Sequence, residues 1–260
     1  MSVAVDGFLS ESLDHVRSHV REKYAAWRGL LMRVNQLAVA NQHAIVIHTD
    51  SNVERYSAVL FARTLATTQA STLLLEAGLV SQARVLLRSA LETLFALAAI
   101  AKDANIVEEL IEGHFAEQKR FAKNAQLWQD DELKKIAEAE TVSGQLQSVL
   151  NSSATALSTF DLAQKAGLED WYRTVYMVFS WPVHGAAVDL NRHVVISGDG
   201  NVEAFRNEPE VDDQESLWLC GIEVLLKAIA ALATTFPNVD QGSMEQYYVE
   251  ARNLESTIAG

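Results

Sequence analysis

Residues 79–101 have the sequence LVSQARVLLRSALETLFALAAIA, which says more about the architecture of this chain than any other segment. Apolar side chains surround nearly the whole helical circumference, interrupted by Arg84, Arg88 and Glu92. A helix that is apolar nearly all round lies at the centre of a protein. A membrane span is disfavoured, because each ionised residue near the bilayer centre costs roughly 2.5 to 3.5 kcal/mol on insertion scales. We therefore expect a central helix of a soluble bundle here.

The apolar spacing on both sides of this segment also predicts helix. The apolar run 217–236 holds Glu223 and Lys227 and is interpreted, like 79–101, as a buried helix rather than a membrane span. A weaker amphipathic stretch covers about 132–150. The other predicted helices cover about 8–42, Asn52 to Ala77 with Gly78 as its stop, about 105–128, 161–166, 170–180 and about 240–256.

One segment departs from the helical pattern. HVVISGDGNVEAF, residues 193–205, places β-branched residues on both sides of a Gly-Asp-Gly-Asn turn, which is typical of a β-hairpin. A lone hairpin is marginally stable in water, so we expect it to pack on the helices. The predicted fold class is therefore all-α, a multi-helix bundle with one small β-hairpin insertion at about 193–206.

Composition favours a single domain. The 260 residues are 49% hydrophobic and 21% charged, with three prolines and twelve glycines, so a large core can form and a flexible linker is disfavoured. We expect one helical domain over 1–260, with the N-terminal helix packed on a core of about 50–236. The N-terminal residues have no basic stretch followed by a continuous apolar stretch, so we expect no signal peptide. The single cysteine, Cys220, is expected to be an inert core residue. These features predict a cytoplasmic protein.

The charge of the chain argues against several functions. The net charge is −13, and residues 101–260 carry twelve basic against twenty-six acidic side chains. An acidic chain is a poor candidate for binding nucleic acid through its overall field. No phosphate loop, dinucleotide fingerprint or nucleophile elbow is present, so we expect no nucleotide and no other cofactor. His15 and His19 have a spacing that can hold zinc, but no third ligand is identified, and we expect no metal.

The charged stripe of the central helix is the candidate site. Arg84, Arg88 and Glu92 lie at i, i+4 and i+8 and therefore share one face. Buried charges must be paired and hydrogen-bonded, because an unpaired one costs several kcal/mol. We expect Glu92 to neutralise Arg88. Arg84 then needs an anion or a second carboxylate.

A second candidate segment, SWPVHG, covers residues 180–185. Pro182 restricts the residue before it and is expected to end a helix. We expect His184 to face the charged stripe, either as a polar residue that closes the bend or as a residue that does chemistry. Ser180 and Arg192 are further candidates for supporting the stripe or binding an anion beside it.

Several of the segments described above resemble those of a known protein family. ARVLLRSALETLFALAAIA at 83–101, YMVFSWPVHG at 176–185 and the hairpin together resemble a widespread bacterial family of all-helical domains of unknown function. That family has an Arg and a Glu separated by three residues, then a Ser and a His with the same spacing, which match Arg88, Glu92, Ser180 and His184. The resemblance covers roughly residues 50–235. It implies a helical bundle and, more loosely, a likeness to the HEPN class of prokaryotic defence and toxin proteins, with no established activity.

Two functions stay open at this point. The first is a binding or interaction protein, such as an accessory protein of a defence or stress system, in which the Arg/Glu/His cluster is structural or binds an anion. The acidic C-terminal part and aromatic residues such as Trp128, Tyr247 and Tyr248 would then serve a protein partner or a homodimer. This reading makes the chain a non-enzyme.

The second function is a metal-independent endoribonuclease of the HEPN type. Arg88 and His184, with Glu92 beside them, would stabilise a phosphorane and move a proton. The HEPN motif, an Arg and a His separated by four to six residues, is absent, since ten residues separate Arg173 from His184. RNA is an expected partner under this alternative alone.

Overall fold

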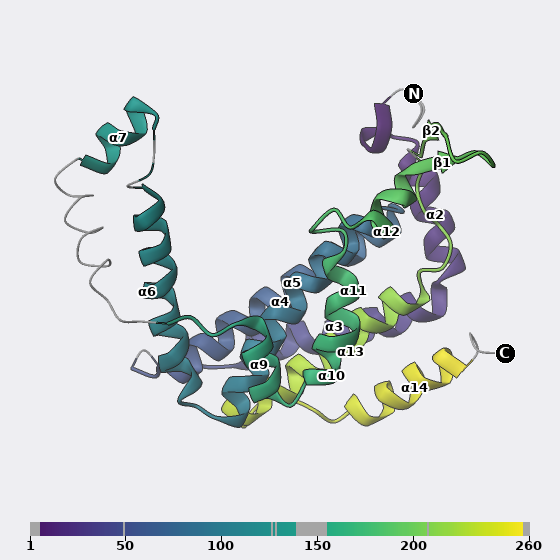
Figure 1. Cartoon of the computed structure of the whole chain (residues 1–260). Coiled ribbons are helices and arrows are strands. Elements are labelled where there is room, and N and C mark those ends of the chain that lie inside the picture. The colour runs from purple at the N-terminus through teal and green to yellow at the C-terminus, as the bar shows by residue number, and fades with distance from the viewer. Residues whose placement is uncertain are drawn as a thin grey trace.

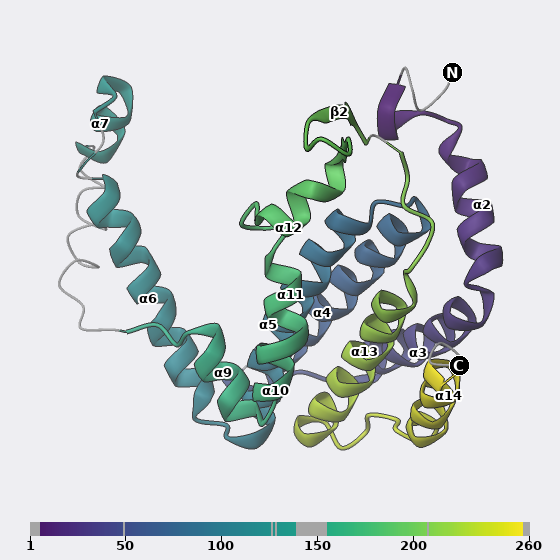
Figure 2. The same cartoon turned by 45° about the vertical axis from the view of Figure 1, so that its right-hand side comes forward.

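The computed structural model describes residues 6–48, 50–125, 127, 129–138, 155–206 and 208–256. Three long helices lie side by side at its centre: α4 (Asn52–Glu76), α5 (Val80–Lys102) and α13 (Glu215–Thr235) (Figures 1 and 2). Each of the three packs against the other two. The prediction that 79–101 forms the central helix is therefore confirmed, and so is the all-α fold class.

Local signals set the ends of α4. The Ser51 hydroxyl accepts a hydrogen bond from the Glu54 backbone N–H, as an N-cap does. Gly78 ends the helix with φ at +71°, a backbone conformation that favours glycine. A Cβ at Gly78 would also lie 2.6 Å from the Pro209 Cβ, so glycine is required here for space as well.

The N-terminal segment contains two α-helices where one was expected. The prediction of a continuous helix over about 8–42 is wrong, because α2 (Leu13–Lys23) ends and α3 (Ala25–Ala44) begins at Tyr24, after a short helix η1 (Gly7–Leu9). The buried Tyr24 hydroxyl accepts from the Gln214 backbone N–H and donates to the Val211 carbonyl. At the residue that makes these two tertiary hydrogen bonds the backbone is not helical, with φ −104° and ψ 28° for Tyr24.

Helix α6 (Ile106–Ala125) extends away from the bundle and carries α7 (Asp131–Glu138) at its far end (Figures 1 and 2). The chain returns at α9 (Thr159–Ala166), which starts with a capping box between Ser158 and Asp161. Most of the predicted stretch 132–150 lies outside the described residues.

A chain of short elements then crosses the bundle. The π-helical turn η2 (Tyr172–Tyr176) joins α10 (Glu169–Trp171) to α11 (Met177–Ser180). Helix α11 packs on α5. The predicted hairpin is confirmed as two antiparallel strands, in which Val194 pairs with Phe205 and Val195 with Ala204. The bounds of these elements, and of the last helix, are α10 Glu169–Trp171, η2 Tyr172–Tyr176, α11 Met177–Ser180, α12 Ala187–Leu190, η3 Asn191–His193, β1 Val194–Ile196, β2 Val202–Phe205 and α14 Met244–Ser256.

One contiguous apolar core extends from α2 to α14 among the described residues. Its largest fully buried side chains include Phe61 on α4, Phe95 on α5 and Trp218 on α13. Cys220 is buried in α13, and burial raises the pKa of its thiol, as expected for an inert core residue. The expectation of one domain over 1–260 stays a prediction.

Two helices of the described part of the chain, α4 and α13, are long and apolar enough to cross a membrane by length and composition alone. Within the most apolar window, 39% of residues are buried in α4 and 67% in α13. Core helices of a bundle pass the same test, so this finding is weak evidence for a membrane span. The segment 79–101 is not among these candidates.

Candidate functional site

Arg88 on α5 is fixed by residues of η2 and α11. Its Nε donates to the Ser180 Oγ over 3.0 Å, and its Nη2 donates to the Tyr176 hydroxyl over 2.7 Å. The Tyr176 hydroxyl in turn donates to Glu92 Oε1 over 2.8 Å. Arg88 Nη2 also lies 3.1 Å from Glu92 Oε1, so the predicted Arg88–Glu92 pair is confirmed. We call these four residues the brace.

The brace ties the short helix α11 to the central helix. The Ser180 hydroxyl donates to the Tyr176 carbonyl one turn earlier, which leaves its oxygen to accept from Arg88. The Arg88 guanidinium also lies over the Tyr176 ring, 4.8 Å from its centroid. Burial, together with the hydrogen bond and the charge of Glu92, raises the pKa of Tyr176 to about 12. Tyr176 therefore stays protonated and acts as a hydrogen-bond donor.

Replacing Tyr176 with phenylalanine is expected to lower the free energy of unfolding by about 1–2 kcal/mol, because two hydrogen bonds to charged groups are lost. Urea unfolding measures this change. Tyr172→Phe is the matched control, since the two rings stack and no hydrogen bond of the Tyr172 hydroxyl is described. Equal stability of the two variants would show that the brace contributes nothing.

His184 does not join the brace. Its side chain is exposed and makes no hydrogen bond or ion pair with any described residue. The bend after α11 is closed by the backbone instead: the His184 N–H donates to the Ser180 carbonyl, and the Ala186 N–H donates to the Trp181 carbonyl. The expectation that His184 faces the charged stripe is therefore wrong. Its imidazole is not the group that closes the bend either.

Arg84 lies one helical turn before Arg88 and has a different environment. Its buried Nε has no hydrogen-bond partner among the described residues. Arg84 and Arg192 of η3 both line a hollow of about 150 Å³. The other lining residues are Val178, Trp181, Pro182, Val188 and Asp189.

The carboxylates near this hollow have other partners. Asp189 is buried and accepts from the Ser81 hydroxyl over 3.2 Å. Glu210 accepts from Arg192 over 3.2 Å. Burial and the positive charge of Arg192 lower the pKa of Arg84, and the charges of Glu210 and Asp189 oppose this only in part. Arg84 is thus a half-buried cation that has no hydrogen-bonded counterion among the described residues.

Exposed apolar side chains line part of the hollow and occupy the same segment of the chain. Trp181 keeps 42% of its surface exposed although it lines the hollow, and Val188 keeps 61%. Exposed apolar groups around a charged pocket are typical of an interaction surface. We call the exposed apolar residues of this segment the apolar rim: Met177, Val178, Trp181, Val183, Val188 and Leu190.

Sequence reasoning missed Tyr176 and Asp189. Tyr176 precedes Ser180 by four residues, so helical spacing alone places both on one face and is a usable signal. No comparable local signal marks Asp189. Among the aromatic residues expected on the surface, Trp128 lies outside the described residues, while Tyr247 and Tyr248 are half-buried against the core.

The fold and this site define a class of protein: an all-helical bundle whose central helix carries the braced Arg88–Glu92 pair. One turn away, the same helix carries Arg84, which has no hydrogen-bonded counterion in the described part of the chain. Within that class the chain belongs to a family of unknown function, DUF5677, which matches residues 54–202. That match contains the brace and both arginines of the hollow. No curated protein and no solved structure matches the chain.

Proposed function

We propose that this protein is a binding protein that recognises a carboxylate of a partner protein with Arg84. The observation that carries the proposal is that the buried Arg84 Nε has no hydrogen-bond partner among the residues that the structure describes, while Arg84 and a second arginine line one hollow. Leaving a buried polar group unsatisfied costs about 1–3 kcal/mol, more for a charged one. A bound carboxylate offsets that loss, and the planar guanidinium suits it because two parallel N–H groups match its two oxygens.

The size and the surroundings of the hollow support a side-chain carboxylate. A volume of about 150 Å³ fits one such group with its first methylenes and is too small for a nucleotide. The apolar rim would cover the neighbouring side chains of the partner, and Trp and Arg are the residue types that dominate binding energy at interfaces. Recognition is local, because salt screens the net negative charge of the chain beyond about 8 Å.

The brace has a structural role in this proposal. It holds Ser180 against Arg88, and the next two residues, Trp181 and Pro182, form walls of the hollow. The nuclease alternative requires Arg88 and His184 to meet, and no described contact joins them, so no observation favours it. A role in defence or stress systems, cytoplasmic localisation and a homodimer stay predictions.

The test is a peptide array of capped pentapeptides with a central glutamate flanked by apolar residues, each paired with its glutamine counterpart. We expect the protein to retain a subset of the glutamate peptides with at least tenfold preference, about 1.4 kcal/mol, over their counterparts. Arg84→Gln should abolish the preference. Arg63→Gln, which removes the same charge from an exposed position on α4, should preserve it.

The Arg84→Gln variant is expected to keep its fold, because the substitution removes a charge that has no hydrogen-bonded counterion among the described residues. Thermal unfolding of both variants checks that point. Retention of glutamate and glutamine peptides to the same extent, no retention of either, or an unchanged preference in Arg84→Gln would each refute the proposal.

A further inference from the structure

A second hollow with arginines lies between α2, α3, α4 and α13. Its volume is about 270 Å³, and none of its lining residues belongs to the brace or to the Arg84 hollow. Its lining includes two arginines, Arg21 and Arg28, and four apolar residues, Leu31, Met32, Leu73 and Leu225.

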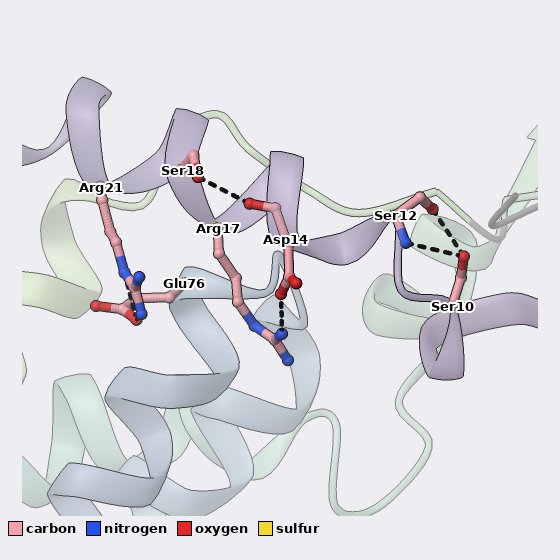
Figure 3. Close-up of polar contacts among 7 residues, drawn as sticks. All are labelled: Ser10, Ser12, Asp14, Arg17, Ser18, Arg21 and Glu76. Carbon is pink, nitrogen blue, oxygen red and sulfur yellow. Dashed lines mark hydrogen bonds and ion pairs between the residues drawn. The ribbon is translucent and has the colours of Figure 1, made fainter. Parts of the chain in front are cut away.

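A buried carboxylate organises the polar side of this hollow. Glu76, at the end of α4, is 3% exposed. Arg21 of α2 reaches it with Nε and Nη2, at 2.9 and 2.6 Å from Oε2, as Figure 3 shows. Arg28 of α3 donates from Nε to the other oxygen, Oε1, over 2.6 Å. Two guanidinium groups thus share one carboxylate, which leaves one positive charge in surplus.

Arg28 is the residue with spare hydrogen-bonding capacity. Its Nε is engaged with Glu76, whereas no described contact engages its two Nη atoms. Other polar groups that line the hollow satisfy one another. Gln69 donates to Asn35, and the Thr72 hydroxyl donates to the Thr68 carbonyl. An anion entering the hollow would therefore meet the Nη edge of Arg28.

The rest of the hollow is apolar. Leu31 and Leu225 are buried beneath it, and Met32 and Leu73 form walls that stay exposed, Leu73 at 64%. An exposed leucine beside a surplus positive charge suits a ligand with one apolar and one anionic end.

We propose that this hollow binds a small amphipathic monocarboxylate. Its carboxylate bonds the Nη edge of Arg28, and its hydrocarbon chain lies against Leu31, Leu225 and Leu73. The single negative charge of this ligand balances the one positive charge that remains where two arginines share the Glu76 carboxylate. The volume lies below the range of about 300–1,000 Å³ for drug-sized ligands, so the ligand is of fragment size, for which hexanoate is a suitable probe. The site is independent of the partner surface around Arg84.

Methyl-detected NMR titration of the full chain with sodium hexanoate tests this proposal, with hexanamide as the uncharged probe of the same shape. We expect saturable shifts of the Leu31, Met32 and Leu225 methyl signals, with a Kd on the order of 1 mM, and at least tenfold weaker binding of hexanamide. Arg28→Gln should weaken hexanoate binding at least tenfold. Arg33→Gln, which removes the same charge from the same helix where Arg33 pairs with Glu250, should leave it unchanged.

A second variant guards against misfolding of Arg28→Gln. Leu73→Asp places a negative charge on an exposed wall, so it should fold normally and weaken hexanoate binding at least fivefold through repulsion and lost apolar contact. The proposal is overturned by the absence of saturable shifts up to about 20 mM hexanoate. Equal affinity for hexanamide, or unchanged affinity in both folded variants, would overturn it as well.

Discussion

Replacing Glu76 with glutamine is expected to lower the free energy of unfolding by about 2–3 kcal/mol at pH 7. Removing one partner of a fully buried ion pair costs about 3–5 kcal/mol. The loss here is smaller, because the side chains of Arg21 and Arg28 are 46% and 33% exposed and can be hydrated again. At about 2–4 °C per kcal/mol, Tm should fall by about 4–12 °C.

Glu250→Gln is the matched control, because it removes the same charge from an ion pair with Arg33 in which both side chains are well exposed. Such surface pairs contribute about 0–1 kcal/mol. Chemical unfolding of the three proteins in urea measures the differences. A Glu76 variant no less stable than the Glu250 variant would show that the buried carboxylate does not hold α2 and α3 to α4.

The Glu76 effect should also depend on pH in a defined direction. Burial alone raises the pKa of Glu76, but hydrogen bonds from Arg21 and Arg28 outweigh it and hold the pKa below its ordinary value. A carboxyl group with a lowered pKa in the folded state contributes its full stability above the unfolded-state pKa of about 4.3 and loses it as the pH falls through the folded-state pKa. The stability difference between wild type and Glu76→Gln should therefore be constant near neutral pH and shrink below about pH 5. A difference that grows on acidification contradicts this assignment.

Replacing Leu94 with alanine should have the largest effect on stability. Leu94 is completely buried on α5, which α4 and α13 both contact, so the variant leaves a cavity that the three helices can fill only in part. Leu→Ala changes at such positions cost about 3–5 kcal/mol. At about 2–4 °C per kcal/mol, Tm should fall by about 6–20 °C, or the variant should fail to accumulate as folded protein.

Leu73→Ala makes the same chemical change on α4, where the side chain is 64% exposed, and should alter stability by about 0.5 kcal/mol or less. Calorimetry on both variants provides the comparison. Similar Tm values for the two would mean that α5 is not at the centre of the bundle.

Local sequence patterns were enough to locate most of the helices and the hairpin. The central helix follows from apolar side chains around the whole circumference of 79–101, and the hairpin from a Gly-rich turn between β-branched residues. The cap at Ser51 and the stop at Gly78 are likewise chemical properties of the residues at those positions. Spacing along one helix also predicted the Arg88–Glu92 pair, because residues at i and i+4 are neighbours in any α-helix.

Local sequence patterns did not predict contacts between segments that are far apart in the chain. The helix break at Tyr24 accompanies hydrogen bonds to residues nearly two hundred positions later. His184 was expected to face the stripe after the bend at Pro182, but its side chain is exposed and no described contact joins it to the stripe. Ser180 itself meets Arg88.

The sequence by itself therefore located most of the helices and the hairpin, since these follow from short-range geometry, and it predicted a counterion for Arg84 from the cost of burying a charge. The tertiary structure alone decided that Tyr176 bridges Arg88 and Glu92, that Arg192 and Arg84 line one hollow, and that Arg21 and Arg28 converge on Glu76. Periodicity tells which face of a helix is buried, but not which other helix covers it. That choice depends on how all the helices pack together.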